Sequence, residues 1–127
     1  MQVPIGGGPV MTLVSSPTPY AVAADTTSVY WTNNYGTIPG TVMRLPLDGG
    51  APVTLASGQD PRAIAVDATS VYWTDHHMNA VMKVARGGGA ATTLASGQAS
   101  PAGIAVDATS VYWTDSAGGS VMKLTPK

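Results

Sequence analysis

Val-Tyr-Trp-Thr occurs three times in this chain, at Val29–Thr32, Val71–Thr74 and Val111–Thr114, with spacings of 42 and 40 residues. A period near forty residues that carries an aromatic signature is typical of the four-stranded blades of a β-propeller. Val, Tyr and Trp are consecutive in each copy and do not alternate with polar residues, which predicts a strand covered on both faces. We therefore expect an all-β fold built from three stacked blades.

The same plan of four strands recurs around each copy. Pro61–Lys83 and Pro101–Lys123 are identical at 16 of 23 positions, and Pro19–Arg44 follows the same plan with a longer loop. Small and β-branched residues come first, an Asp-x-Thr-Ser turn leads to the aromatic strand, and a Gly-rich turn precedes the outermost strand. The aspartates of the Asp-x-Thr-Ser turns, Asp25, Asp67 and Asp107, are expected to accept local backbone N–H bonds. Named A to D from the axis outward, the expected strands are Ala21–Ala24, Ala63–Val66 and Ile104–Val106 (A); Ser28–Thr32, Ser70–Thr74 and Ser110–Thr114 (B); Val42–Leu45, Val81–Val84 and Val121–Leu124 (C); and Val10–Val14, Val53–Ala56 and Thr92–Ala95 (D).

The order of these strands shows where the repeat is cut. The chain reads as one domain, with an outer strand at about residues 1–18 and repeats at 19–60, 61–100 and 101–127, so it opens with a D strand and closes with a C strand. An unpaired edge strand invites pairing, and three blades are fewer than the roughly four to eight that close a propeller. We therefore predict an obligate homodimer, in which Val10–Val14 of each copy completes the third blade of the other and the two chains form a six-bladed ring. A nine-bladed trimer is the alternative.

Composition narrows the function classes. Charged residues make up 10% of the chain and the net charge is −1, so we expect no surface for nucleic acid or anionic lipid. The lack of cysteine excludes disulfides, thiolate metal sites and a cysteine nucleophile. No apolar run approaches the ~18 residues of a membrane span. The compartment is left open, although the start lacks a signal peptide and reads like the middle of a repeat array, as in a larger extracellular or periplasmic parent.

The motif Tyr-Trp-Thr-Asp at Tyr72–Asp75 and Tyr112–Asp115, with the segment Arg44–Gly49, resembles the YWTD repeats of the low-density-lipoprotein receptor family. The resemblance covers essentially the whole chain, and the related NHL and strictosidine-synthase-like propellers share the general plan. It implies a ring of six blades. The sequence departs from the family because Asn33 replaces the motif aspartate in the first repeat and no Cys-rich module flanks the repeats. The ligands of the receptors therefore do not carry over.

The loops between strands D and A and between strands B and C lie on one face of a propeller, around the mouth of the central channel. The repeats differ most in these loops, as expected if a site is grafted on a fixed scaffold, or if the loops drift without constraint. The candidate ligand-binding residues in or beside them are Tyr20, Asn33, Arg62, Asp75, His76, His77 and Asp115.

We expect none of these residues to be catalytic. His76 and His77 are adjacent, so on a strand they would point to opposite sides and could not easily chelate one ion. The motif aspartates are expected to accept backbone hydrogen bonds that tie adjacent blades together, and no Gly-x-Ser-x-Gly elbow occurs.

The sequence thus predicts a binding or interaction scaffold with no cofactor and no metal. Its expected partners are a second copy of the chain and a small-molecule, glycan or protein ligand. Two alternatives stay open: a propeller hydrolase or lyase with a divalent metal near the axis, and a propeller fragment that only self-assembles.

Overall fold

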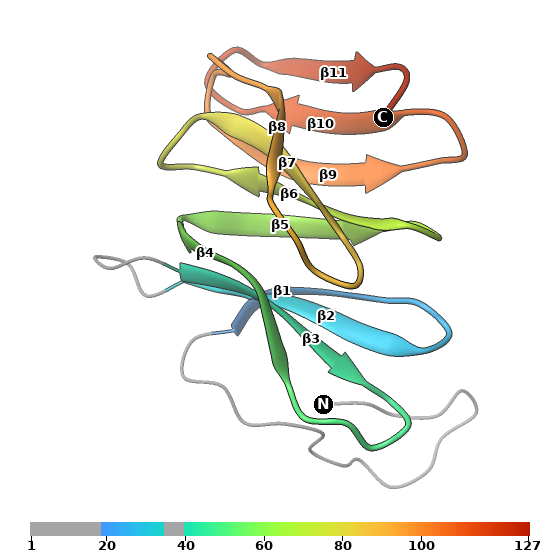
Figure 1. The fold of residues 1–127 in the computed structure, drawn as a ribbon. Coiled ribbons are helices and arrows are strands. Elements are labelled where there is room, and N and C mark those ends of the chain that lie inside the picture. The colour runs from blue at the N-terminus through green and yellow to red at the C-terminus, as the bar shows by residue number, and fades with distance from the viewer. Residues whose placement is uncertain (1–18, 35–39) are drawn as a thin grey trace, which may run out of the picture.

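Three antiparallel sheets follow one another along the chain and stack face to face in this computed structural model, which describes residues 19–34 and 40–127 (Figure 1). The first sheet contains β1 (Pro19–Ala24), β2 (Ser28–Asn33), β3 (Gly40–Pro46) and β4 (Val53–Gln59). The second contains β5 (Pro61–Val66), β6 (Ser70–Asp75), β7 (Ala80–Ala85) and β8 (Thr92–Ala95). The third contains β9 (Pro101–Val106), β10 (Val111–Asp115) and β11 (Ser120–Leu124).

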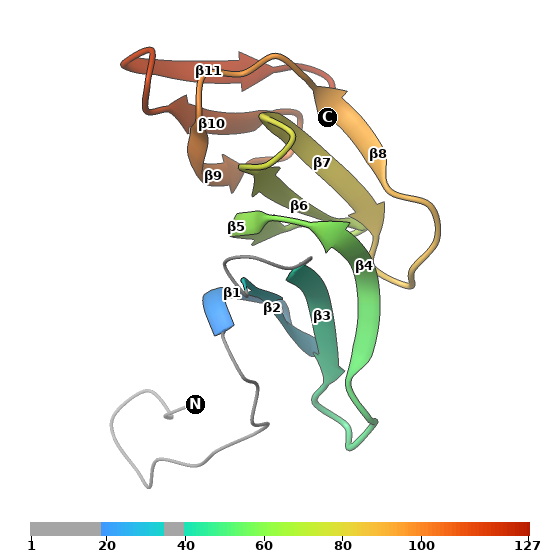
Figure 2. The same cartoon turned by 90° about the vertical axis from the view of Figure 1, so that its left-hand side faces the viewer.

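Each sheet is a blade whose strands pair in chain order, as the A-to-D plan predicts. The innermost strands β1, β5 and β9 lie next to one another, and the outer strands β4 and β8 lie on the opposite side of the stack (Figure 2). The third blade has three strands in the described part, and the expected exchanged strand Val10–Val14 lies outside the described residues. That part also contains no helix long and apolar enough to span a bilayer.

The aromatic strand is the core of the first two blades, because both of its faces are covered there, whereas Thr114 of β10 is exposed. Every residue of β6 is buried. Successive side chains of a strand point to opposite faces. Tyr30 and Trp73 accordingly lie in the cluster between the first two blades, and Tyr72 and Trp113 lie in the cluster between the second and third. The prediction of a sandwiched strand is confirmed for β2 and β6, whereas β10 is covered on the side of Trp113 only.

The motif threonine joins neighbouring blades through a single hydroxyl group. The pairing of β5 with β6 is irregular between Pro61 and Ile64. At this bulge, the Ala63 N–H donates to Thr74 Oγ1 (3.2 Å), and the same hydroxyl donates to the carbonyl of Ala102 in the next blade (2.8 Å). The threonine therefore satisfies one backbone group in its own blade and one in the next, which explains its place in the repeat.

Candidate functional site

A pocket of about 320 Å³ opens on the loop face of the blades, between the ends of the innermost strands and the loops that follow β6 and β10. Three of the predicted residues meet there: Tyr20 from β1, Arg62 from β5 and His76 from the loop after β6. The remaining lining residues are Ala63, Ser100, Pro101, Ala102, Gly103 and Ser116. The pocket thus combines one permanent cation, one imidazole, an aromatic ring and two serine hydroxyls.

Arg62 is the central charge of this pocket. Its Nη2 lies 3.4 Å from Asp60 Oδ2, and its guanidinium lies 5.6 Å from the centre of the Tyr20 ring. Burial lowers the pKa of Arg62, but the hydrogen bond and charge of Asp60 outweigh it and raise the pKa above its ordinary value. Arg62 Nε is buried and has no hydrogen-bond partner among the described residues. The guanidinium is held beside the pocket by Asp60 and the Tyr20 ring.

His76 and His77 differ in position. His76 lies between Asp60, whose Oδ2 is 3.9 Å from Nδ1, and Ser100, whose Oγ is 3.2 Å from Nε2. His77 is exposed and does not line the pocket. Among the described residues, no group of three His, Cys, Asp or Glu side chains is arranged to hold a metal ion.

Three other predicted site residues lie below the surface. Asn33 is buried and donates from Nδ2 to Thr41 Oγ1 (3.0 Å). Asp75 is fully buried, and its Oδ1 accepts from the backbone N–H groups of Met78 (3.0 Å) and Asp60 (3.4 Å). Asp115 is also buried. None of the three lines the pocket. Asp75 accepts backbone hydrogen bonds as expected: one comes from the loop of its own blade and one from Asp60, the last residue of the preceding repeat. Thr74 makes the bond to the next blade.

Ser100 and Ser116 are the polar lining residues that the sequence did not single out. Ser100 has a positive φ of 56°, and its carbonyl accepts from both the backbone N–H (3.0 Å) and the hydroxyl (2.9 Å) of Ser116. The alignment of the repeats could have identified both residues, because Ser116 aligns with His76 and Ser100 aligns with Asp60.

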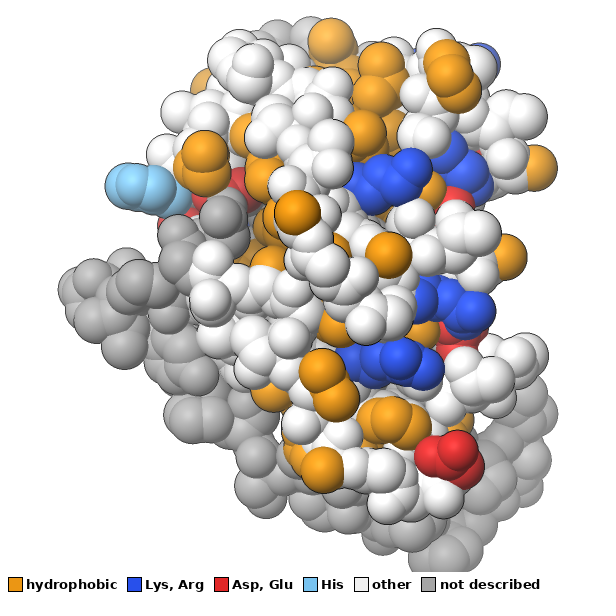
Figure 3. Space-filling view, viewed as in Figure 1, with side chains coloured by type: hydrophobic (Ala, Val, Ile, Leu, Met, Phe, Trp, Pro, Cys, Tyr) orange, Lys and Arg blue, Asp and Glu red, His pale blue; other side chains and the backbone are white. Residues whose placement is uncertain are grey.

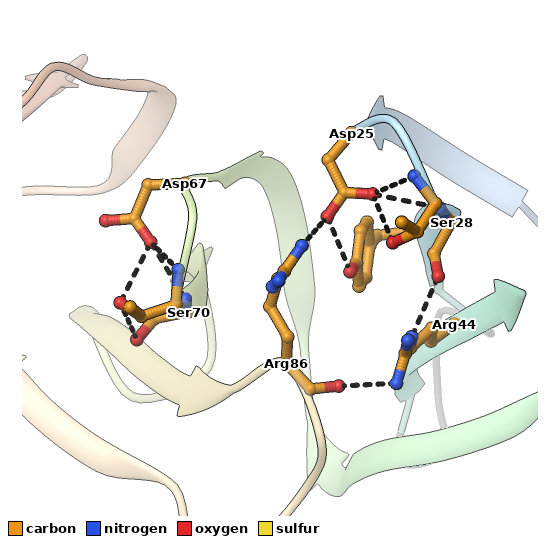
Figure 4. A network of polar contacts seen from close by, with 9 residues as sticks. Asp25, Ser28, Arg44, Asp67, Ser70 and Arg86 are labelled. Carbon is orange, nitrogen blue, oxygen red and sulfur yellow. Dashed lines mark hydrogen bonds and ion pairs between the residues drawn. The ribbon is translucent and has the colours of Figure 1, made fainter.

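The edge of the stack that carries the A–B turns, opposite the pocket, is held by charged side chains. Asp25 Oδ1 accepts from the N–H groups of Thr27 and Ser28, and its Oδ2 accepts from the Tyr30 hydroxyl and pairs with Arg86 of the next blade (Figure 4). Burial raises the pKa of Asp25, but these donors together hold it well below its usual range.

The same arrangement recurs in the other blades. Asp67 Oδ2 lies 2.7 Å from Lys127 Nζ in the following blade. No blade follows that of Asp107 within the described residues, and the Tyr112 hydroxyl and two backbone N–H groups lower the pKa of Asp107 to about 2. In Figure 3, Lys and Arg side chains gather beside acidic ones toward this edge, and histidine lies at the opposite edge. These carboxylates are structural ties, as the sequence predicts for the turn aspartates.

Comparison with known proteins identifies the fold family that the three sheets resemble. No protein-family model and no curated protein matches the chain. A structure of a nidogen/laminin complex matches with TM-score 0.67 and 25% identity, over 86% of this chain and 48% of that chain. The virginiamycin B lyase from Staphylococcus aureus matches with TM-score 0.64 and 16% identity, over 85% of this chain and 41% of that chain. A streptogramin B lyase matches with TM-score 0.65 and 15% identity, over 90% of this chain and 42% of that chain.

The chain therefore spans less than half the length of each of these proteins. The likeness, together with the three stacked sheets, shows that the chain has a β-propeller fold.

Proposed function

We propose that this chain is a non-catalytic binding scaffold, half of a six-bladed ring that a second copy completes, with its ligand on the loop face. The observation that supports binding is the pocket in which Tyr20, Arg62 and His76 converge. Concave sites with a few convergent polar groups are where small ligands bind. The sequence identity to the two lyases is too low for their activity to be assigned to this chain.

The chemistry of the pocket favours a small ligand that carries a carboxylate or another anionic group. Arg62 is the only permanent cation among the lining residues, and guanidinium groups pair well with carboxylates. The Tyr20 ring offers a flat surface, and Ser100 and Ser116 offer hydroxyl groups for orientation. Acidic sugars and short acidic peptides fit this description.

Calorimetry with a panel of acidic sugars and acidic peptides tests the binding proposal. We expect Arg62→Gln and His76→Ala to weaken binding about tenfold or more, because each removes a polar group from the pocket. His77→Ala is the matched control, since His77 adjoins His76 in the chain but does not line the pocket. A panel without any binder, or equal losses in both histidine variants, would count against the proposal.

Ring closure is supported by the three-blade stack, whose third blade ends on β11 without a fourth strand in the described part. In this proposal, Val10–Val14 of each copy pairs with β11 of the other. Light scattering should give twice the 12.9 kDa mass of the chain. A mass of three chains would instead indicate the nine-bladed ring, and a single-chain mass would contradict both.

A second candidate function, ester hydrolysis, is favoured by one observation. Ser100 Oγ, His76 and Asp60 lie in the order of a nucleophile, a base and an orienting carboxylate, although the 3.9 Å between His76 and Asp60 is longer than a hydrogen bond. In this scheme Ser100 Oγ attacks the ester carbonyl, its proton passes through His76 Nε2 to the leaving alcohol, and water then releases the acid. Turnover of nitrophenyl esters that is abolished in Ser100→Ala would favour hydrolysis, and turnover that persists in that variant would exclude this site.

A further inference from the structure

Each end of the stack carries a valine that is exposed although the equivalent residue of another blade is buried. We define the leading face of a blade as the side toward the following blade, and the trailing face as the side toward the preceding one. Val42 and Val81, on the leading faces of the first two blades, are 0% exposed, but the equivalent Val121 of the third blade is 78% exposed. On the trailing faces, Ile64 is 8% exposed, but the equivalent Val22 of the first blade is 69% exposed, whereas Trp31 and Leu45 of the same face are buried.

We propose that these two faces are the joint between copies: the leading face of the third blade of one chain docks on the trailing face of the first blade of a second chain. This inference rests on the ring closure proposed above and adds the contacts that make it. The interface that we infer occurs twice within the chain already, between blades one and two and between blades two and three. The two surfaces differ from each other, so the joint is head to tail, the type that generates rings.

The first contact of the joint is the threonine bond. Thr32 Oγ1 donates to the carbonyl of Arg62 (2.8 Å), just as Thr74 Oγ1 donates to the carbonyl of Ala102. Thr114 Oγ1 accepts from Gly103 N–H (3.0 Å) but donates to nothing within the described residues. Tyr20 occupies the position of Arg62 and Ala102 in the first blade. At the joint, Thr114 therefore donates to the backbone carbonyl of Tyr20 in the second copy.

The second contact is made by a cation on the third strand of each blade. Arg44 Nη1 donates to the backbone oxygen of Arg86 (3.2 Å; Figure 4), and Lys83 Nζ donates to that of Lys127 (3.3 Å), which lies one position further along the repeat. Lys123 is the equivalent of Arg44 and Lys83 in the third blade, where its Nζ lies 5.7 Å from the centre of the Tyr112 ring. At the joint, Lys123 donates to the backbone oxygen that corresponds to that of Arg86.

That oxygen belongs to Leu47. The Leu47 N–H donates to the carbonyl of Thr27 (2.8 Å), and the Arg86 N–H donates in the same way to that of Thr69 (3.0 Å). The two residues thus occupy equivalent positions at the end of the third strand.

The joint lacks the ion pair that both interfaces within the chain contain. Arg86 pairs with Asp25, and Lys127 pairs with Asp67. In the joint, Asp107 of one copy faces Leu47 of the next, which carries no charge. We therefore infer that the joint is weaker than the other interfaces and is where the ring opens.

Two charged substitutions test the assignment of the faces. Val121→Asp and Val22→Asp place a carboxylate on the leading or the trailing face, and neither buries a charge in a single chain because both valines are exposed there. Sedimentation equilibrium should show dimer dissociation constants raised about a hundredfold or more by each, because a desolvated charge would have no partner. Val53→Asp, at an exposed valine of β4 outside both faces, is the control and should leave the constant within about threefold.

Mixing the two disrupted variants tests the head-to-tail arrangement. A pair of one Val121→Asp chain and one Val22→Asp chain contains one joint with both substitutions and one joint with none. We expect the mixture to form dimers more tightly than either variant alone. An isologous interface offers no such intact joint, so a mixture that stays as dissociated as its components would overturn the arrangement.

Leu47→Arg tests whether Asp107 lacks an ion-pair partner at the joint. The expected result is tighter dimerisation, which a misfolded variant would not show. The new guanidinium can reach Asp107 of the second copy, as Arg86 reaches Asp25, so the dimer should tighten about fivefold at low salt. Leu47→Gln is the uncharged control and should give no tightening. No difference between the two variants would overturn this contact.

The failures of the two proposals are distinguishable. A wild-type chain that stays monomeric at all concentrations would overturn ring closure itself. A wild-type dimer whose affinity is unchanged by both Val121→Asp and Val22→Asp would leave ring closure standing and overturn the faces proposed here.

Discussion

Thr74 shows how one side chain shapes two blades. Its hydroxyl accepts from Ala63 N–H, where the ladder between β5 and β6 is interrupted, and donates to the carbonyl of Ala102 in the third blade. Thr74 is fully buried, so water cannot replace either bond. A hydroxyl is the smallest group that both accepts and donates at one atom, and this dual capacity gives the residue its structural role.

Thr74→Val should therefore destabilise the fold although the two side chains have nearly the same shape. The change leaves Ala63 N–H and the carbonyl of Ala102 without their partner, at a cost of about 2 kcal/mol. Urea unfolding followed by tryptophan fluorescence measures this loss. Thr54→Val, at an exposed threonine of β4, should change stability by less than about 0.5 kcal/mol. Equal effects of the two changes would contradict the role given to Thr74.

Asp67 should make the stability of the fold depend on pH. Burial raises the pKa of its carboxyl, but hydrogen bonds from Lys127, the Tyr72 hydroxyl and the N–H groups of Thr69 and Ser70 outweigh it, so the folded pKa lies well below its usual range. The unfolded value is about 3.9. A lowered pKa means that the charged carboxylate stabilises the fold above about pH 4, and this contribution is lost as the pH falls toward the folded pKa.

Asp67→Asn should accordingly cost about 1 kcal/mol near pH 7, because a charged acceptor becomes neutral. The difference in the free energy of unfolding between wild type and variant should shrink as the pH falls from about 5 to 2. In this range the carboxyl of the unfolded wild-type chain becomes protonated, so the charged form in the fold stabilises it less. Urea titrations at several pH values, at one protein concentration, give this difference directly. A gap between the two proteins that is constant with pH would refute the assignment.

At the scale of the secondary structure, β11 is an open edge at a position that is paired on both sides in the other two blades. It pairs with β10 on one side, and no described strand lies on its other side. The equivalent strands β3 and β7 each pair on both sides, with β4 and β8. An open strand edge exposes backbone donors and acceptors to other chains, so a partner strand for β11 decides whether the third blade is stable.

Deletion of residues 1–16, which lie outside the described residues and contain the strand proposed for exchange, should expose this edge. We expect aggregation or unfolding, measured by light scattering and circular dichroism, because nothing then covers β11. A synthetic peptide of residues 1–16 should restore solubility when added in excess. A truncated chain that is soluble, folded and monomeric would contradict strand exchange.

At the scale of the whole molecule, folding and assembly are expected to be one process. Val121 on the leading face of the third blade and Val22 on the trailing face of the first blade are exposed. In the proposed ring a second chain covers both, and the stability of a molecule that folds as a dimer rises with concentration by mass action.

The melting temperature should consequently rise with each tenfold increase in protein concentration. Scanning calorimetry across a hundredfold range measures this, and Leu47→Arg should shift the whole series upward because it tightens the joint. A melting temperature that is independent of concentration would indicate a fold complete within one chain.

The repeat pattern was enough to predict the blades, because the same order of buried and exposed residue types recurs with a fixed period along the sequence. Val-Tyr-Trp-Thr predicted the strands β2, β6 and β10 and the two covered faces of β2 and β6, and the Asp-x-Thr-Ser turns predicted the local bonds of Asp25, Asp67 and Asp107. These features depend on near neighbours and on a period, and both are visible in a single sequence.

The pocket was not predictable in the same way. Asp60, His76 and Ser100 come from three different loops, and their side chains meet only because adjacent blades bring those loops to one face. Asp75 and Asn33 are equally polar in sequence, yet the structure buries both beneath the loops. Local order in the chain decides which residues form strands, whereas the packing of one blade on the next decides which loop side chains reach solvent together, since that packing depends on contacts far apart in the chain.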